Sequence, residues 1–237
     1  MSMLPKIFPP YPDRNDVDLH AILHPAKEVG GDLYDFYMDG NHLYFLIGDV
    51  SGKGVPASLF MAITRSLFRT LSQHVLSPAK IVTEMNNSIS DNNESNMFVT
   101  LIVGILDLET GILKLCNAGH NPPILIYPDG QVSYLEFKTQ IFVGVVEDFK
   151  YSDEEVVLEK ESKLFLYTDG VTEAENINKE LYGEEKLLEM LSDNASSDVR
   201  TTVNVVVDSI ASHVKEAEAS DDLTILLIQY EPGTANS

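Results

Sequence analysis

The thirteen-residue stretch LIGDVSGKGVPAS, residues 46–58, constrains the fold of this chain more than any other segment. An apolar run over residues 42–47 ends in Gly48-Asp49, a loop with two glycines follows, and Pro56 opens an apolar helix pattern. This order predicts a strand, a tight loop and a helix start, because proline fits the first helical turn, where its missing N–H breaks no bond. The Asp49 carboxylate is therefore expected where the strand stops.

Three other segments carry aspartates at similar predicted places, each at a strand end or in a turn. They are GGDLYD (residues 30–35), YTDG (residues 167–170) and SDDLT (residues 220–224). Carboxylates that converge on one spot repel each other and lose hydration energy unless a cation neutralises them. Hard oxygen ligands suit Mg²⁺ or Mn²⁺. The aspartate pattern therefore indicates a divalent-metal site.

The turn Asp39-Gly40-Asn41 predicts that two of these carboxylates are neighbours. It separates two strand candidates, residues 33–38 and 42–50, and its composition is typical of a hairpin. Antiparallel pairing places the start of the first strand beside the end of the second. Asp32 and Asp49 are thus expected side by side.

Composition excludes several classes of protein. The chain has 237 residues, enough for one large domain or two small ones, and 44% of them are hydrophobic. Its formal charge of 16 − 37 = −21 argues against binding nucleic acid or an anionic membrane. No apolar run reaches the ~18 residues of a membrane helix, and the first residues lack signal-peptide features. The single cysteine, Cys116, cannot form an internal disulfide and is read as a buried apolar residue, which favours a cytoplasmic setting.

The remaining elements follow from periodicity and turn chemistry. Residues 1–16 are a proline-rich lead-in expected to be extended, and residues 231–237 are a tail expected to be disordered. Helices are predicted to begin at Pro56 and after the N-cap Ser77, and to cover residues 183–191 and 199–214. The first of these helices carries an apolar stripe of Leu59, Ile63, Leu67 and Leu71, which Phe60 and Phe68 widen. Strands are predicted over residues 18–23, 33–38, 42–50, 98–106, 112–117, 123–127, 132–135, 156–158, 164–167 and 223–229. This order is typical of a segregated α+β fold.

Six motifs in one order resemble a known family. They are EVGGDLYDF, GDVSGKGVPA, FVTLIVGILD, NAGHNPP, LYTDGVTEA and SDDLT, and together they span about residues 4–229. The sequence resembles the SpoIIE/RsbU-type bacterial serine phosphatases, relatives of the type 2C, metal-dependent PPM protein phosphatases. The resemblance implies a four-layer αββα sandwich of two mainly antiparallel sheets flanked by helices, over residues 17–230. It also implies that residues 1–16 end a linker from an upstream sensor or receiver domain.

The same resemblance implies a site with two Mn²⁺ or Mg²⁺ ions. It implies that Asp49 bridges both ions, that the Val50 carbonyl binds one, and that Asp169 and Asp221 complete the other. Asp32 is implied to help hold the ions through bound water. These four aspartates are also the implied catalytic residues.

The choice of Asp221 over its neighbour Asp222 rests on alignment with the family's acidic position before the threonine of the last strand. The family's activity would be hydrolysis of phosphoserine or phosphothreonine on an anti-sigma-factor antagonist, a STAS-domain protein. An upstream domain, an activating partner or a homodimer is implied as the regulator. The alternative from another functional class is a catalytically weak or inactive domain of this fold that binds a partner.

Several polar residues keep a structural alternative beside a functional one. Asp39 and Asp129 are read as turn formers, since Asp-Gly is a common turn pair. Lys53 either contacts phosphate or is a solvated loop lysine. His120 suggests a general acid, but a histidine in such a turn is more often structural. Asp35 either supports the metal ligands or caps a turn.

Two comparisons with other phosphate-binding sites complete the sequence argument. The larger type 2C phosphatases carry a phosphate-binding arginine near the first acidic motif, whereas the nearest base here is Lys27 and the role of Glu28 stays open. GDVSGKG does not match a P-loop, because its glycine spacing is short and Gly54 replaces the required Ser/Thr. Residues 52–57 fit G-x-G-x-x-A, but a second helix follows instead of the strand that a dinucleotide fold needs.

Overall fold

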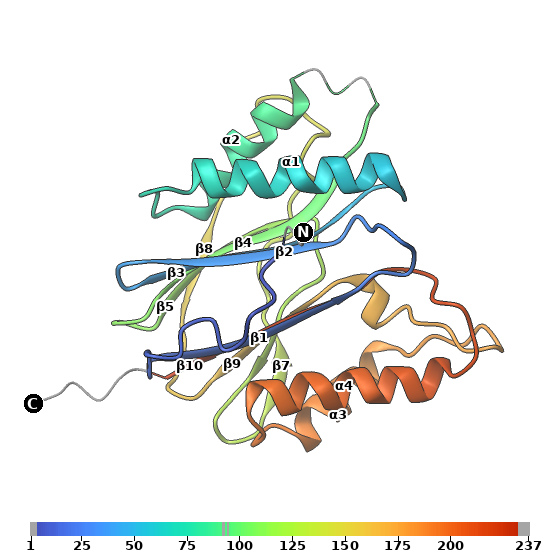
Figure 1. Ribbon diagram of the computed structural model, residues 1–237. Coiled ribbons are helices and arrows are strands. Elements are labelled where there is room, and N and C mark those ends of the chain that lie inside the picture. The colour runs from blue at the N-terminus through green and yellow to red at the C-terminus, as the bar shows by residue number, and fades with distance from the viewer. Residues whose placement is uncertain (1–3, 92, 94, 232–237) are drawn as a thin grey trace, which may run out of the picture.

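Two five-stranded sheets lie face to face in the computed structural model, which describes residues 4–91, 93 and 95–231. A pair of helices covers the outer side of each sheet, so that the chain forms four layers (Figure 1). Every pair of neighbouring strands within the two sheets is antiparallel. The predicted αββα sandwich is therefore confirmed.

Each sheet is named here by its first strand. The β1 sheet contains, in order, β1 (Val17–His24), β10 (Leu223–Tyr230), β9 (Lys163–Tyr167), β6 (Ile124–Ile126) and β7 (Val132–Tyr134). The β2 sheet contains, in order, β2 (Leu33–Asp39), β3 (His42–Val50), β4 (Val99–Asp107), β5 (Ile112–Ala118) and β8 (Glu154–Val157). The helices α1 (Val55–Leu71) and α2 (Pro78–Ser90) cover the β2 sheet, and α3 (Glu184–Asp193) and α4 (Val199–Val214) cover the β1 sheet.

Three apolar clusters fill the spaces between the four layers. The central one joins the facing sides of both sheets and includes Phe45 and Leu226. The second packs α1 and α2 on the β2 sheet, and the third packs α3 and α4 on the β1 sheet. Strands β4 and β9 are buried along nearly their whole length, as their unbroken apolar runs predict for strands covered on both faces. Burial on both faces is what requires a helix layer outside each sheet.

The helix α1 buries only part of the predicted stripe. Leu59 is 61% exposed and Ile63 is 54% exposed, so that part of the prediction is wrong. Phe68 is fully buried and Leu67 and Leu71 pack against the second cluster, as predicted, and Ala57 and Thr64 are fully buried beside them. Small residues at positions 57 and 64 let the helix backbone approach the sheet. Leu59 and Ile63 lie on the opposite side of the same turns because successive helical residues are rotated by about 100°.

The polar turn after β8 joins the two sheets instead of forming a hairpin. Strand β8 pairs with β5 in the β2 sheet, whereas β9 pairs with β10 and β6 in the β1 sheet. Three residues of β8 are exposed, while all five residues of β9 are buried. An edge strand tolerates exposed residues, whereas a central strand needs apolar residues on both faces. The exposed β8 therefore lies at the edge of the β2 sheet, and the buried β9 lies at the centre of the β1 sheet.

The lead-in packs on the domain where the structure describes it, over residues 4–16. Leu4, Phe8 and Tyr11 lie against the central cluster, and the Tyr34 hydroxyl donates a hydrogen bond of 2.5 Å to the Pro5 carbonyl. The Arg200 guanidinium donates to the Phe8 carbonyl at 3.1 Å. The lead-in therefore contacts both sheets. The tail predicted for residues 231–237 lies outside the described residues apart from its first, and no helix among those described is long and apolar enough to cross a membrane.

Candidate metal centre

The predicted site aspartates come from four segments that end at the same edge of the sandwich. Asp32 immediately precedes β2, and Asp49 is the penultimate residue of β3. Leu33 pairs with Gly48, which places these two carboxylates side by side as the hairpin predicts. Asp169 begins the short helix η1 (Asp169–Val171) after β9, and Asp221 precedes β10. The site thus draws on both sheets.

Asp32 holds the two sheets together at this edge. Its carboxylate is 3% exposed, and its Oδ2 atom accepts hydrogen bonds from Thr168 at 2.8 Å and from Thr224 at 2.5 Å. Both threonines belong to the β1 sheet side, whereas Asp32 leads into the β2 sheet. The threonines therefore fix the orientation of this carboxylate.

Burial, together with mutual repulsion, raises the pKa values of three of the clustered carboxyl groups. Burial, then the Asp169 and Asp221 charges, raise the pKa of Asp49 to about 7. Burial and the Asp49 charge raise the pKa of Asp32 well above its ordinary value. Burial and the Asp221 charge raise the pKa of Asp169. Each group resists ionisation because it is partly desolvated beside other negative charges, and a bound cation would reverse that effect.

The neighbours Asp221 and Asp222 have different surroundings. Asp222 is 6% exposed, and its carboxylate accepts backbone N–H bonds from Ala26 at 2.8 Å and Gly31 at 2.9 Å. The Asp221 carboxylate points to the surface and accepts a bond of 3.0 Å from the Lys53 ammonium. Asp222 is therefore occupied in holding the loop before β2. Asp221 is the more exposed of the two, with 40% of its side chain accessible.

Three glycines let the site loops approach closely. A Cβ atom on Gly30 would lie 1.8 Å from Asp222 Oδ2, and one on Gly170 would lie 1.9 Å from the Asp222 carbonyl oxygen. A Cβ atom on Gly31 would lie 2.8 Å from the Val50 carbonyl oxygen and 3.4 Å from Asp49 Oδ1. The absence of a side chain on Gly31 thus leaves space beside two of the predicted metal ligands.

The donor set and the space fit a hard divalent cation. Carboxylate and carbonyl oxygens are the ligands that Mg²⁺ and Mn²⁺ favour. Within the described ranges, no group of three or more His, Cys, Asp or Glu side chains lies close enough together to hold a metal ion as it stands. The Lys53 ammonium group lies against the Asp221 carboxylate. It donates to Asp221 Oδ2 at 3.0 Å and to the Ser220 carbonyl at 2.8 Å. A cation that binds Asp221 has to displace this ammonium group.

His120 lies behind the site and not in it. The ring is 4% exposed, and its Nδ1 atom is 2.9 Å from the Thr100 hydroxyl, whose residue pairs with Asp49 across the ladder. Burial lowers the pKa of His120 to about 4, so the ring is neutral at neutral pH. This placement favours the structural alternative over the general acid.

Asp35 has a role that neither sequence alternative describes. Its carboxylate is fully buried and pairs with two arginines of α1, Arg65 Nε at 2.9 Å and Arg69 Nε at 2.6 Å. The pairs tie β2 to the helix that follows the Asp49 loop. The spacing of four residues puts both arginines on one side of the helix, and this was the available sequence signal. Their partner Asp35 lies 30 positions from Arg65 and 34 from Arg69, so no local pattern identifies it.

The remaining polar candidates lie apart from the acidic cluster. Asp129 accepts a hydrogen bond from the Gln131 amide at 2.9 Å in the hairpin between β6 and β7, as its turn role predicts. Asp39 ends β2 and lies 3.1 Å from His74, and Glu28 is an exposed loop residue.

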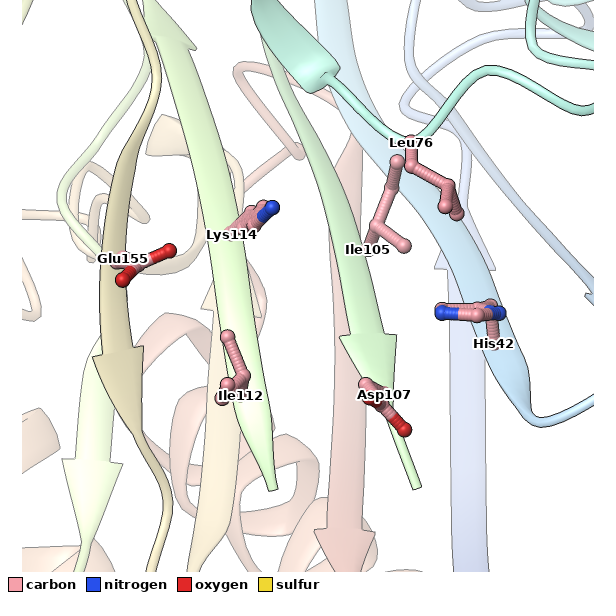
Figure 2. A pocket seen from close by; sticks show the side chains of 7 residues that line it. All are labelled: His42, Leu76, Ile105, Asp107, Ile112, Lys114 and Glu155. Carbon is pink, nitrogen blue, oxygen red and sulfur yellow. The ribbon is translucent and has the colours of Figure 1, made fainter. Parts of the chain in front are cut away.

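A separate hollow of about 130 Å³ lies at the opposite end of the β2 sheet from Asp49. Figure 2 shows four of its polar residues, which are paired across the ladder: His42 with Asp107, and Lys114 with Glu155.

Comparisons with known proteins agree with this geometry. A family model described as Stage II sporulation protein E (SpoIIE) matches residues 39–231. The phosphoserine phosphatase RsbU of Bacillus subtilis (strain 168) is 27% identical over 219 residues, which cover 92% of this chain and 64% of RsbU. The curated relatives are longer, and the chain spans between 36% and 64% of their length.

Solved structures show the same fold. The SiaA-PP2C domain of Pseudomonas aeruginosa superimposes with a TM-score of 0.81 at 22% identity, covering 90% of this chain and 86% of that one. A crystal structure of RsbX in complex with magnesium superimposes with a TM-score of 0.70 at 18% identity, covering 92% and 97% of the two chains. At sequence identities of 22% and 18%, these superpositions establish a shared fold.

Proposed function

Because this chain belongs to the SpoIIE family and carries a phosphatase domain of the SpoIIE/RsbU type, we propose that it is a metal-dependent phosphoprotein phosphatase acting on phosphoserine or phosphothreonine. The observation that carries the proposal is the convergence of Asp32, Asp49, Asp169 and Asp221 at one edge of the two sheets. Burial and the neighbouring negative charges raise the pKa values of Asp32, Asp49 and Asp169, an arrangement that a structural turn does not need and that a bound cation would relieve.

The proposed site holds two Mn²⁺ or Mg²⁺ ions. Asp49, the Val50 carbonyl, Asp169 and Asp221 would hold the ions, and Asp32 would help through bound water. Two ions supply a nucleophilic water and neutralise the phosphoryl oxygens. The chain itself orients the ligands: two threonine hydroxyls hold Asp32, and Gly31 keeps space beside Asp49. The magnesium complex of RsbX, which shares the fold, supports the choice of ion.

The proposed substrate is a phosphorylated STAS-domain protein, the antagonist of an anti-sigma factor. The likeness to RsbU, which is named a phosphoserine phosphatase, supports this class of substrate. Dephosphorylation would change the binding state of the STAS protein and so alter sigma-factor control in the cytoplasm. An inactive domain that only binds a partner is the alternative, and the presence of every predicted metal carboxylate favours the enzyme.

The first test is metal-dependent hydrolysis. The purified chain is expected to hydrolyse p-nitrophenyl phosphate slowly, with Mn²⁺ at least as effective as Mg²⁺, because the acidic cluster needs a divalent ion to accept a phosphoryl group. Excess EDTA is expected to abolish the activity, and added Mn²⁺ to restore it. The measurement is p-nitrophenol release, followed by phosphate release from a phosphorylated STAS protein. Turnover that persists in excess EDTA would contradict the metal site.

A second test concerns activation through the upstream side. Joining a dimerising coiled coil ahead of Met3 is expected to raise kcat/KM several-fold. The physical reason is that Phe8 and Tyr11 pack on the core beside β2, which is tied to α1 by the Asp35 pairs. Sedimentation verifies the dimer, and a fusion of the same length that stays monomeric is the control. An unchanged kcat/KM in a verified dimer would place the activating contact elsewhere.

A further inference from the structure

A second hollow, of about 190 Å³, lies directly beside the acidic cluster, and we call it the flanking groove. Its floor is apolar and comes from α4 and the start of β10, with Ile210, Val214 and Leu223. Its rim carries Glu175, from the segment after η1, and Glu218, from the segment before β10. The volume is below the ~300–1,000 Å³ of typical small-molecule pockets, so the groove suits a single side chain.

The flanking groove shares a wall with the proposed metal centre. Ser220 and Asp221 line both the groove and the hollow that contains Asp49 and Lys53. Gly170, which follows Asp169, also lines the groove. A peptide that places its phosphorylated residue at the acidic cluster and extends over residues 220–221 brings an adjoining residue to the groove.

Charge selects the kind of side chain that this groove accepts. Three of the described residues that line it are acidic, and neither lysine nor arginine is among them. Glu218 is exposed at the rim, while Glu175 already pairs with Lys179 at 2.7 Å. Asp221 pairs with Lys53 at 3.0 Å, so Glu218 is the lining carboxylate for which no ion pair is found among the described residues. An acidic side chain would be repelled by Glu218, and an uncharged one would gain nothing from its charge.

We propose that the flanking groove binds a lysine or arginine next to the phosphorylated residue of the protein substrate. The proposal rests on the proposed phosphatase function and specifies its substrate class. The aliphatic stem of the basic residue lies on Ile210, Val214 and Leu223, and its charged head meets Glu218. In the preferred substrate, the negative phosphate lies at the metal centre and the positive side chain of the neighbouring residue lies in the groove beside it.

The test uses phosphoserine peptides that differ at one position at a time, with Arg, Gln or Glu on either side of the phosphoserine. Phosphate release is measured with saturating Mn²⁺ at constant ionic strength, and kcat and KM are separated. On one of the two sides of the phosphoserine, the Arg peptide is expected to have a kcat/KM at least ~5-fold above that of the Glu peptide. The difference should come mainly from a lower KM. Hydrolysis of p-nitrophenyl phosphate, which has no neighbouring residue, reports the phosphatase function separately.

Charge reversal provides the variant and its matched control. In Glu218→Lys, the ratio of kcat/KM for the Arg and Glu peptides is expected to fall to one or below, because the rim then attracts the acidic peptide. Glu216→Lys makes the same change of charge two positions away, at an exposed residue outside the groove, and is expected to leave the ratio unchanged. Filling the floor with Ala211→Phe is expected to raise KM for the Arg peptide selectively.

The outcomes separate the two proposals. Hydrolysis of p-nitrophenyl phosphate and of all peptides with an Arg-to-Glu ratio near one would overturn the flanking groove alone. Equal loss of the ratio in Glu216→Lys and Glu218→Lys would also overturn it, because a general field effect would then account for the preference. Absence of hydrolysis with every substrate and Mn²⁺ would overturn both proposals.

Discussion

Asp49→Asn is expected to lower kcat/KM by more than ~100-fold with saturating Mn²⁺. The substitution keeps the shape of the side chain but removes the negative charge proposed to bridge two dications. Loss of an outer-shell partner in a metal site already costs ~10–100-fold, so loss of a bridging ligand should cost more. Phosphate release from p-nitrophenyl phosphate and from a phosphopeptide measures the change.

The same substitution is expected to stabilise the metal-free fold. The pKa of Asp49 is raised to about 7 in the folded chain, so the folded state binds its proton more tightly than the unfolded state does. Stability of the metal-free protein therefore falls as pH rises from the ordinary aspartate range through about 7. Asn has no such charge, and the Tm of Asp49→Asn in EDTA at pH 8 should be roughly 5–10 °C higher. Below pH 4 the difference should vanish.

Asp129→Asn is the matched control for this experiment. Asp129 is an aspartate in a hairpin turn, its side chain accepts only the Gln131 amide among the bonds found in the described chain, and asparagine serves the same turn. Its activity should stay within about 2-fold of the unmodified protein. Near-full activity in Asp49→Asn, or a large loss in Asp129→Asn, would show that the active site is placed wrongly.

Asp35→Ala is expected to destabilise the fold by about 3 kcal/mol, or roughly 6–12 °C in Tm. Asp35 is fully buried between Arg65 and Arg69, and its removal leaves two guanidinium groups against β2 without their carboxylate. Thermal or urea unfolding in EDTA measures the change without a contribution from bound metal.

Asp39→Asn serves as the control, because it removes an aspartate only four positions away whose contact with His74 is largely exposed. Its effect should stay within about 0.5 kcal/mol, as for other surface pairs. A Tm for Asp35→Ala within about 2 °C of the unmodified protein would mean that the buried pairs do not hold α1 on the sheet.

Local sequence was sufficient wherever the deciding interaction lies within one turn. The turn at residues 39–41 sets the pairing of β2 with β3, and this register alone puts Asp32 beside Asp49. Ser77 caps α2 by accepting the Lys80 amide, as its position before Pro78 predicts. Unbroken apolar runs identified β4 and β9 as strands covered on both faces. The four-layer order itself came from the family resemblance, since no local pattern specifies how two sheets stack.

Tertiary structure alone decided the contacts between distant segments. Periodicity identified α1 but only part of the face that it buries, because small residues at the sheet and the pairing of Arg65 and Arg69 with Asp35 outweigh the exposed Leu59 and Ile63. Asp221 and Asp222 are equal in the sequence. Only the fold buries Asp222 under the backbone amides of residues 26 and 31 and leaves Asp221 beside Lys53, because those amides lie about 190 positions away and have no signature near the pair.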